Sequence, residues 1–169
     1  SACVQIGCLD VPVSSLTYHR DSPKGQLIDT GGNFNMTNNV TSLQNVTAIR
    51  PFSVDMAAKE TSSTSRCTHR GEFPLPMNDG STFFTPVFYN PSASDTILSP
   101  EAICFNSRGL LTHWCQSGST TADFGSVSFF NKDGAEVISL MLQKRNGLYY
   151  TSVDAITVDA GPEPTQSKT

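Results

Sequence analysis

The sequence predicts an all-β domain built from short strands, with a single short helix. Short segments such as residues 51–56 alternate apolar and polar residues, which is the pattern of a half-buried strand. Turn sequences such as Asn78-Asp79-Gly80 and Asn146-Gly147 separate these segments. Only the stretch that begins at Ser99-Pro100 carries a helix-start signal. The chain has 169 residues, 37% of them hydrophobic, which is enough for one domain with a buried core.

The first half of the chain predicts strands separated by polar connections. Bounded by turn residues, the expected elements are an edge strand at 3–8, a polar connection at 21–25, a buried strand that ends at Asp29, a strand at 51–56, and a hairpin of 73–77 and 82–89 around residues 78–80. Residues 58–70 are polar and show no core-forming pattern.

The second half predicts the helix and a further run of strands. Ser99 is a suitable N-cap, Pro100 a suitable first helical residue, and Gly109 a suitable end of the helix. We then expect strands at 126–130, 136–142 and 148–150, with turns at 131–134 and 146–147. The tail, residues 161–169, is rich in Pro, Ser and Thr, a composition typical of disorder. The chain shows no internal repeat.

Charge and hydropathy argue against two classes of partner. The net charge is −4 and the pI is about 5.2. Nucleic-acid binding depends on clustered Lys and Arg, so we expect no nucleic-acid partner for this domain. No run of 18 apolar residues occurs, so we expect no membrane partner either.

The cysteines and the sequons point to different compartments. The five cysteines, an odd number at irregular spacing, favour free thiols in a reducing compartment. Three Asn-x-Thr sequons, at Asn35, Asn39 and Asn45, would be used only in a secreted protein. We give the cysteines more weight and expect a cytoplasmic protein.

The segment Leu27-Ile28-Asp29-Thr30-Gly31 carries the clearest chemical signal in the chain. Two aliphatic residues running into Asp-Thr-Gly are the pattern with which aspartic proteases hold a carboxylate at the end of a buried strand. Two such carboxylates a few ångström apart share one proton. The ionised one then activates a water and the protonated one assists the scissile carbonyl and the leaving amine. One usable copy in this chain therefore predicts an active site built by two chains.

The residues around Asp29 have separate expected roles. Thr30 offers a hydroxyl that can brace the loop against its twin in a second chain. Gly31 allows a sharp turn at a point where a Cβ would clash. We therefore assign Asp29, Thr30 and Gly31 to the catalytic site. The alternative interpretation is an ordinary surface turn, because Asp-Thr-Gly is common turn composition.

Other candidate sites carry weaker signals. Residues 156–161 superficially repeat the first motif, but only eight residues follow Gly161, so we interpret Asp159 as a strand-end or turn residue. Cys67-x-His69 and His113-x-Cys115 have a spacing unlike the usual zinc loops, so we expect no metal and no cofactor. Neither Cys104 nor Cys115 has an evident partner base, and we expect Trp114 to be in the core.

Five motifs in a fixed order make the chain similar to one family. They are Leu27 to Gly31 followed by Met36, the strand and turn at 54–58, a glycine-containing segment with Gly71, Tyr89-Asn90-Pro91 followed by Ile97-Leu98-Ser99, and the basic-Asn-Gly-Leu-Tyr element at 144–150. Over about residues 25–150 the chain resembles the protease of copia-type (pseudovirid) LTR retrotransposons, a branch of the retropepsins. It departs from the family pattern at Gly32, where Ala or Ser is usual, and at Asn35, where His is usual.

The resemblance implies a retropepsin-like, closed and mostly antiparallel β domain that works as a homodimer. It implies an N-terminal extension or linker at 1–24, the protease domain at 25–152 and a C-terminal tail at 153–169. The polar stretch at 59–70 would be a flap over the substrate, or else a plain surface loop.

The implied activity is that of an aspartic endopeptidase in a virus-like particle. Its substrate would be an extended polypeptide, the element's own Gag-Pol polyprotein, with an Asp29 from each subunit at the dimer axis. Two alternatives stay open: an inactive or domesticated dimerisation or peptide-binding module on the same scaffold, and a secreted β-domain whose sequons are used.

Overall fold

The fold is described here from a computed structural model. It describes residues 3–6, 9–12, 25–54, 65–118 and 121–151. Strands dominate this part of the chain, and α2 (Pro100–Phe105) and the 3₁₀ turn η1 (Val40–Ser42) are the helical elements within it. The prediction of an all-β domain with one short helix is confirmed. None of the helices in the described ranges is long and apolar enough to cross a membrane.

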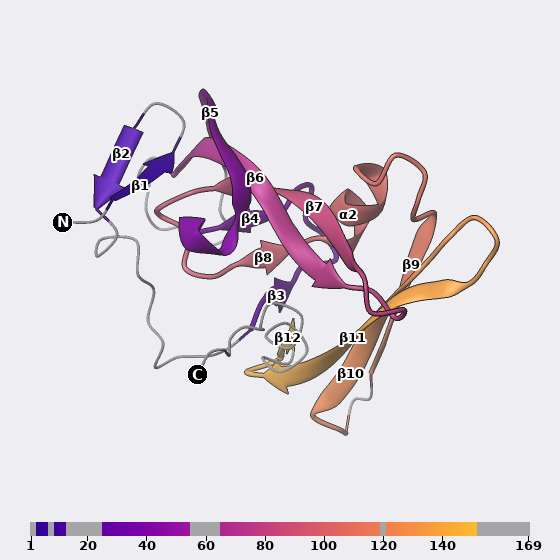
Figure 1. The fold of residues 1–169 in the computed structure, drawn as a ribbon. Helices are drawn as coiled ribbons and strands as arrows, with labels where there is room; N and C mark the ends of the chain where they lie inside the picture. The colour runs from indigo at the N-terminus through magenta and orange to yellow at the C-terminus, as the bar shows by residue number, and fades with distance from the viewer. Residues whose placement is uncertain (1–2, 7–8, 13–24, 55–64, 119–120, 152–169) are drawn as a thin grey trace, which may run out of the picture.

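Ten of the described strands form one sheet (Figure 1). In spatial order they are β5 (Gln44–Ser53), β6 (Arg66–Pro76), β7 (Thr82–Tyr89), β4 (Met36–Thr37), β8 (Ile97–Leu98), β3 (Leu27–Ile28), β12 (Leu148–Thr151), β11 (Glu136–Arg145), β10 (Phe124–Phe130) and β9 (His113–Gly118). The pairs β3–β8 and β4–β7 are parallel, and the other pairs are antiparallel.

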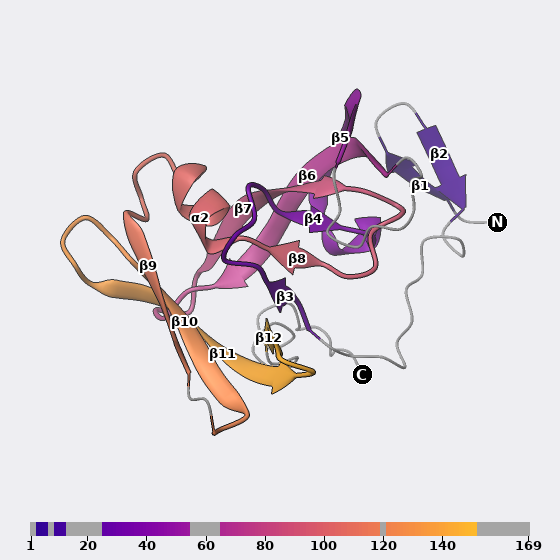
Figure 2. The same cartoon turned by 180° about the vertical axis from the view of Figure 1, so that it is seen from behind.

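The sheet is bent rather than closed. In the described residues its order runs from β5 at one edge to β9 at the other, without a pair that joins those edges, so the expected closure is not found. Three central strands, β4, β8 and β3, have only two residues each, and the longer strands fall into two wings on either side of them. In Figures 1 and 2 the β6–β7 hairpin reaches the β10–β11 wing, where the Asn78 N–H donates to the Val137 carbonyl at 2.9 Å. The tip of this hairpin thus contacts the other wing.

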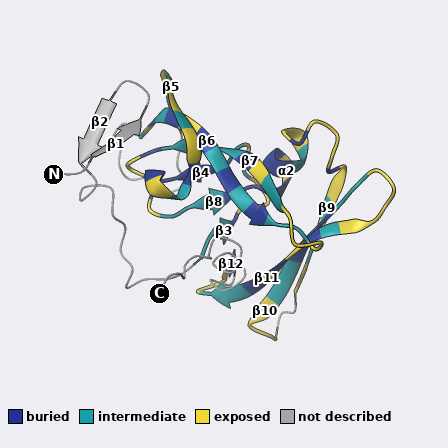
Figure 3. Cartoon of the chain, in the orientation of Figure 1, coloured by how far each residue is buried: buried dark blue, intermediate teal, exposed yellow. Residues whose placement is uncertain are grey.

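One hydrophobic core fills the space between the two wings (Figure 3). Phe73, Leu75 and Val87 come from the β6–β7 hairpin, and Phe129 and Leu140 come from β10 and β11. All five side chains are almost fully buried. Burial on this scale is the main favourable contribution to folding, at about 25 cal/mol per Å² of apolar surface.

Strand β6 corrects one expectation from the sequence. Residues 66–70 were expected to lack a core pattern, but they begin β6, in which every second residue is buried from Cys67 through His69, Gly71, Phe73 and Leu75. A thiol, an imidazole and a glycine occupy the first three inward positions. Because none of these three residues is aliphatic, the sequence of 66–71 does not show the alternation of apolar and polar residues that predicts a strand.

Strand β5 is longer than expected and irregular. It spans Gln44–Ser53, so the expected strand at 51–56 overlaps only its end, and residues 55–56 lie outside the described part. Its register with β6 shifts twice, and its partly buried residues recur at every third position, at Val46, Ile49 and Phe52. Bulges of this kind blunt an edge strand against unwanted pairing.

The predicted turns are confirmed. The β6–β7 hairpin turns at 77–81 with Gly80 at φ 92°, and the β10–β11 hairpin turns with Gly134 at φ 83°. Asn146 and Gly147 have φ values of 53° and 80°. Two successive positive φ values are what a two-residue type I′ hairpin needs.

Helix α2 begins as predicted and ends early. The Ser99 hydroxyl accepts from the Ala102 N–H at 3.1 Å, and Pro100 is the first helical residue. The helix ends at Phe105 instead of near Gly109, because Asn106 caps it: both its backbone N–H and its side-chain amide donate to the Ala102 carbonyl.

The N-terminal strand does not join the main sheet. The expected edge strand at 3–8 is found as β1 (Cys3–Ile6), which pairs with β2 (Leu9–Pro12) in a separate two-stranded sheet. The central strands β4 and β8 and the edge strand β9 were not predicted. Two-residue strands carry too few positions to show a period.

Candidate functional site

Asp29 follows β3 in the centre of the sheet. Strand β3 pairs with β8 on one side and with β12 on the other. The Asp29 N–H donates to the Leu98 carbonyl at 2.9 Å, while the residue itself is exposed. The strand, in which Ile28 is buried and Leu27 partly buried, ends at Asp29 as the sequence predicted, and Asp29 itself is exposed.

Two backbone N–H groups in the turn after Asp29 donate hydrogen bonds back to Asp29. The Gly31 N–H donates to Asp29 Oδ1 at 3.0 Å, and the Gly32 N–H donates to the Asp29 carbonyl at 3.1 Å. Thr30 is exposed at the tip of this turn. The first bond orients the carboxylate toward its own loop.

The expected clash at Gly31 is not found within the chain. Gly31 does not have a positive φ, and a Cβ built there would meet only Asp29 Oδ1, at 3.7 Å, which is an ordinary contact. The tighter position is Gly32, where a Cβ would lie 3.1 Å from Asp29 Oδ2. The carboxylate thus occupies part of the space that an alanine methyl would fill.

Beneath this turn lies a layer of buried hydrogen bonds. Ser99 Oγ donates to the Gly32 carbonyl at 2.8 Å. The Ser99 N–H in turn donates to Asn35 Oδ1 at 2.7 Å, and Asn35 Nδ2 donates to the Pro86 carbonyl at 2.9 Å. Asn35 and Ser99 are 1% and 0% exposed. The residues that brace the turn are therefore shielded from water.

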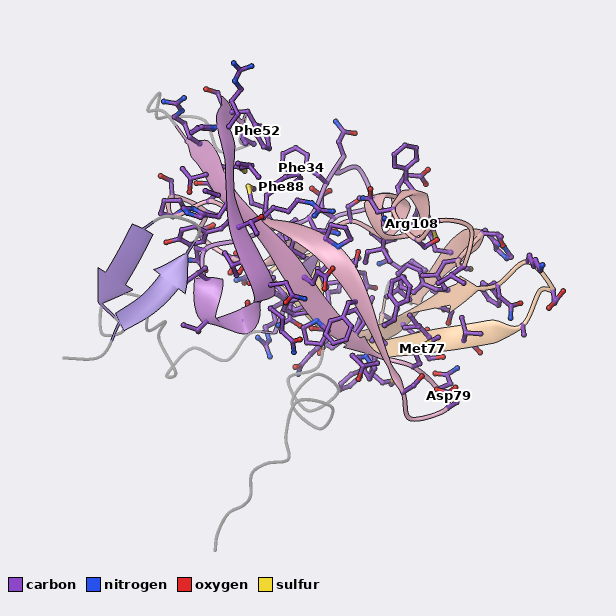
Figure 4. The ribbon with its side chains drawn as sticks, turned by 45° about the horizontal axis from the view of Figure 1, so that its top comes forward. Phe34, Phe52, Met77, Asp79, Phe88 and Arg108 are labelled. Atoms are coloured by element: carbon purple, nitrogen blue, oxygen red, sulfur yellow. The ribbon has the colours of Figure 1, made fainter. Side chains whose placement is uncertain are left out.

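An aromatic cluster lies on one side of the same loop. Phe34, Phe52 and Phe88 meet in pairs at ring-centroid distances of 5.1–5.8 Å with edge-to-face geometry. Each ring is only partly buried. Figure 4 shows the three together beside β5 and β6, away from Met77 and Asp79 at the hairpin turn and from Arg108 near α2. This cluster gives the loop an apolar neighbour.

The expected flap falls only partly within the described residues. Residues 59–64 lie outside them, and residues 66–70 belong to β6. There Cys67 and His69 are buried, and the His69 ring lies 6.0 Å from that of Tyr89. The second half of the expected flap is thus part of the packed sheet, because its side chains alternate inward.

The weaker candidate sites do not assemble. Cys67 and His69 are buried on β6, whereas His113 and Cys115 are exposed on β9 at the edge of the other wing. In the described part of the chain, no group of three or more His, Cys, Asp or Glu could hold a metal ion. Asp159 lies outside the described residues.

Neither the buried Cys67, nor the partly buried Cys104, nor Trp114 adds a reactive site. Burial raises the pKa of Cys67 to about 11, and burial together with Glu101 raises the pKa of Cys104 to about 11, so both are poor nucleophiles. Trp114 packs against the core, half-buried, and its Nε1 donates to Glu101 Oε1 at 3.1 Å.

The asparagines of the three sequons differ in how far they are exposed. Asn35 is buried with both ends of its amide engaged, and Asn39, which is 9% exposed, accepts from the N–H and the hydroxyl of Thr41. Asn45 is exposed and donates to Glu72 Oε1 at 3.1 Å. Only Asn45 is placed where a glycan is compatible with the described fold.

Comparison with protein-family models, with curated proteins and with solved structures found no match to the chain. The site is therefore interpreted from its own geometry. Sequence reasoning found Asp29 but missed the bracing role of Asn35 and Ser99. The available signals were the departure from the family pattern at Asn35 and the N-cap at Ser99, and neither indicated that the two residues touch.

Proposed function

We propose that this chain is an aspartic endopeptidase that acts as a homodimer, with one Asp29 carboxylate from each subunit at the dimer axis. One observation carries the proposal: a central, partly buried strand leads into an exposed aspartate on a turn that buried hydrogen bonds brace from below. Such bracing is what a catalytic group needs and a plain surface turn does not. The motif order described above supports a copia-type retrotransposon origin and the element's own Gag-Pol polyprotein as substrate.

In the proposed reaction the two carboxylates share one proton. The ionised Asp29 removes a proton from a water that attacks the scissile carbonyl carbon. The protonated Asp29 donates a hydrogen bond to the carbonyl oxygen and later passes a proton to the leaving amine. Thr30, at the exposed tip of the turn, is the residue best placed to brace one loop against its twin. The rate should be higher at mildly acidic pH, because one carboxyl must hold a proton.

The test compares wild-type protein with Asp29→Asn on denatured casein and on a polyprotein substrate. Asp133→Asn, an exposed aspartate in the β10–β11 turn, is the matched control and should cleave normally. Pepstatin-type inhibition should match the loss in Asp29→Asn. Cleavage that survives in Asp29→Asn would refute the assignment.

A mixing experiment tests the shared active site. In an equal mixture of wild-type and Asp29→Asn chains, random pairing leaves roughly half of the activity per wild-type chain if one carboxylate must come from each subunit. Unchanged activity per wild-type chain would place a complete site in a single chain. A folded dimer without any cleavage would instead support the non-catalytic module on the same scaffold.

A further inference from the structure

Asn35 is an unusual residue for the interior of this domain. It is 1% exposed, and its amide is engaged at both ends. Oδ1 accepts from the Ser99 N–H at 2.7 Å, and Nδ2 donates to the Pro86 carbonyl at 2.9 Å, with a longer contact of 3.4 Å to Thr85 Oγ1. Its own carbonyl accepts from the Phe88 N–H at 3.0 Å. One side chain thus joins β7 to the start of α2.

The segment that Asn35 holds is the one that holds the Asp29 turn. Leu98 accepts from the Asp29 N–H at the beginning of the turn, and Ser99 Oγ donates to the Gly32 carbonyl at its end. Residues 98 and 99 therefore fix both ends of the turn, while the Asn35 amide fixes residue 99. The path from Asn35 to the turn has two hydrogen bonds, each no longer than 2.8 Å.

We propose that Asn35 is the positioning residue of the Asp29 turn and acts through Ser99 to fix where the Asp29 carboxylate stands. The inference rests on the proposed function for its consequence in catalysis, but the position of the carboxylate can be measured without it. Asn35 does not touch the reacting atoms, so its contribution is to the geometry of Asp29 alone. A misplacement of about 1 Å in such a group costs on the order of 100-fold in rate.

The amide chemistry explains the choice of residue. The site needs an acceptor toward Ser99 and a donor toward Pro86, and a neutral amide supplies both from one side chain. An aspartate would lack the donor and would bury a charge. A neutral histidine also carries one acceptor and one donor, which makes Asn35→His the conservative variant at this position.

The chain offers a matched control four residues away. Asn39 is also a largely buried asparagine with an engaged side chain, but it caps η1, where its Oδ1 accepts from the Thr41 N–H and hydroxyl. Asn39→Ala should therefore lower stability without moving Asp29. A purely structural role for Asn35 would make the two alanine variants behave alike.

The experiment follows the backbone N–H signal of Gly31 by NMR, because this group donates to Asp29 Oδ1 and its chemical shift therefore reports where the carboxylate stands. We expect Asn35→Ala to move this signal, Asn35→His to return it toward the wild-type position, and Asn39→Ala to leave it unchanged. In the cleavage assay, Asn35→Ala should lower kcat at least about 10-fold with little change in KM.

The outcomes separate the two proposals. If wild-type protein does not cleave at all, the proposed function fails, and the Gly31 N–H signal still decides the positioning role. If Asn35→Ala and Asn39→Ala lose similar stability and both keep the wild-type Gly31 signal, the positioning role is refuted. If Asn35→Ala does not fold, Asn35→His carries the test, and a folded Asn35→His whose Gly31 signal does not lie near the wild-type position would also refute it.

Discussion

Replacing Gly31 with alanine separates what the folded chain requires from what a dimer requires. Within the chain, the added methyl would meet only Asp29 Oδ1, at 3.7 Å, and Gly31 does not have a positive φ. An alanine at such a position stabilises a protein by about 0.4–1 kcal/mol, because it restricts the unfolded chain. For a protein of this size, that corresponds to a Tm increase of roughly 1–4 °C.

Gly71→Ala provides the contrasting control. Its Cβ would lie 2.9 Å from Leu43 Cβ and 3.0 Å from the Gln44 carbonyl, inside the packed β5–β6 region. Overpacking of this kind costs about 1–3 kcal/mol, which would lower the Tm by roughly 2–12 °C. Thermal unfolding of both variants, followed by circular dichroism, tests the two contrasting expectations.

The second measurement concerns the proposed dimer. If two Asp29 turns meet at an axis, a methyl on Gly31 narrows the space between them. The Gly31→Ala dimer should therefore have a higher dissociation constant and cleave substrate more slowly, while each chain stays folded. Sedimentation equilibrium and cleavage rates across a concentration series measure this. A Tm loss of several degrees would refute the reasoning about the single chain. Unchanged dimerisation and cleavage would show that no partner approaches Gly31.

Three further predictions concern the thiols and the sequons. Because burial raises the pKa of Cys67 to about 11, its thiolate fraction at pH 8 should be about 100-fold below that of an ordinary thiol, and peptide mapping after iodoacetamide should find the exposed Cys115 labelled before the buried Cys67. The folded state keeps the Cys67 proton between pH 9 and about 11 while the unfolded state loses it, so stability should fall as pH rises through that window; a flat stability profile there would contradict the assignment. If the chain is directed into the secretory pathway, folded product should carry glycan only at Asn45, and glycan at Asn35 in folded protein would contradict the structure.

The turn chemistry explains why much of the fold could be predicted. Asn-Gly at 146–147 and the glycines at 80 and 134 take the positive φ values that the hairpins need, so local sequence and fold agree there. Ser99 and Pro100 likewise start the helix by local rules. These elements depend on neighbours in sequence, which is the information that a single sequence carries.

The missed elements depend on distant neighbours. Strands β4 and β8 have two residues each and exist because β3 and β7 lie beside them. The inward alternation of β6 begins with Cys67 and His69, which become core only through packing against β7 and β5.

The candidate site likewise combines a residue that a local motif marks with a residue whose role depends on a partner distant in sequence. Asp29 was visible because a short motif marks it. The brace from Asn35 was not, because its partner Ser99 is 64 residues away. The expected need for a glycine at Gly31 was wrong for a related reason, because a sequence does not show where the Asp29 side chain lies. The carboxylate accepts from the Gly31 N–H, but it would lie closer to a Cβ on Gly32 than to one on Gly31.

Strand β3 has a consequence for the order in which this domain can be assembled. Leu27 pairs with Tyr150. The Thr151 hydroxyl donates to Gln26 Oε1 at 2.6 Å and accepts from the Gln26 N–H at 2.9 Å. During synthesis at about 5–20 residues per second, roughly 6–25 s pass between the synthesis of Gln26 and that of Thr151. Until then one side of β3 lacks its neighbour. The residues that hold the Asp29 turn, up to Ser99, are synthesised earlier, so a ribosome-bound fragment that ends before β12 would carry this turn at the end of a strand that is paired on one side only.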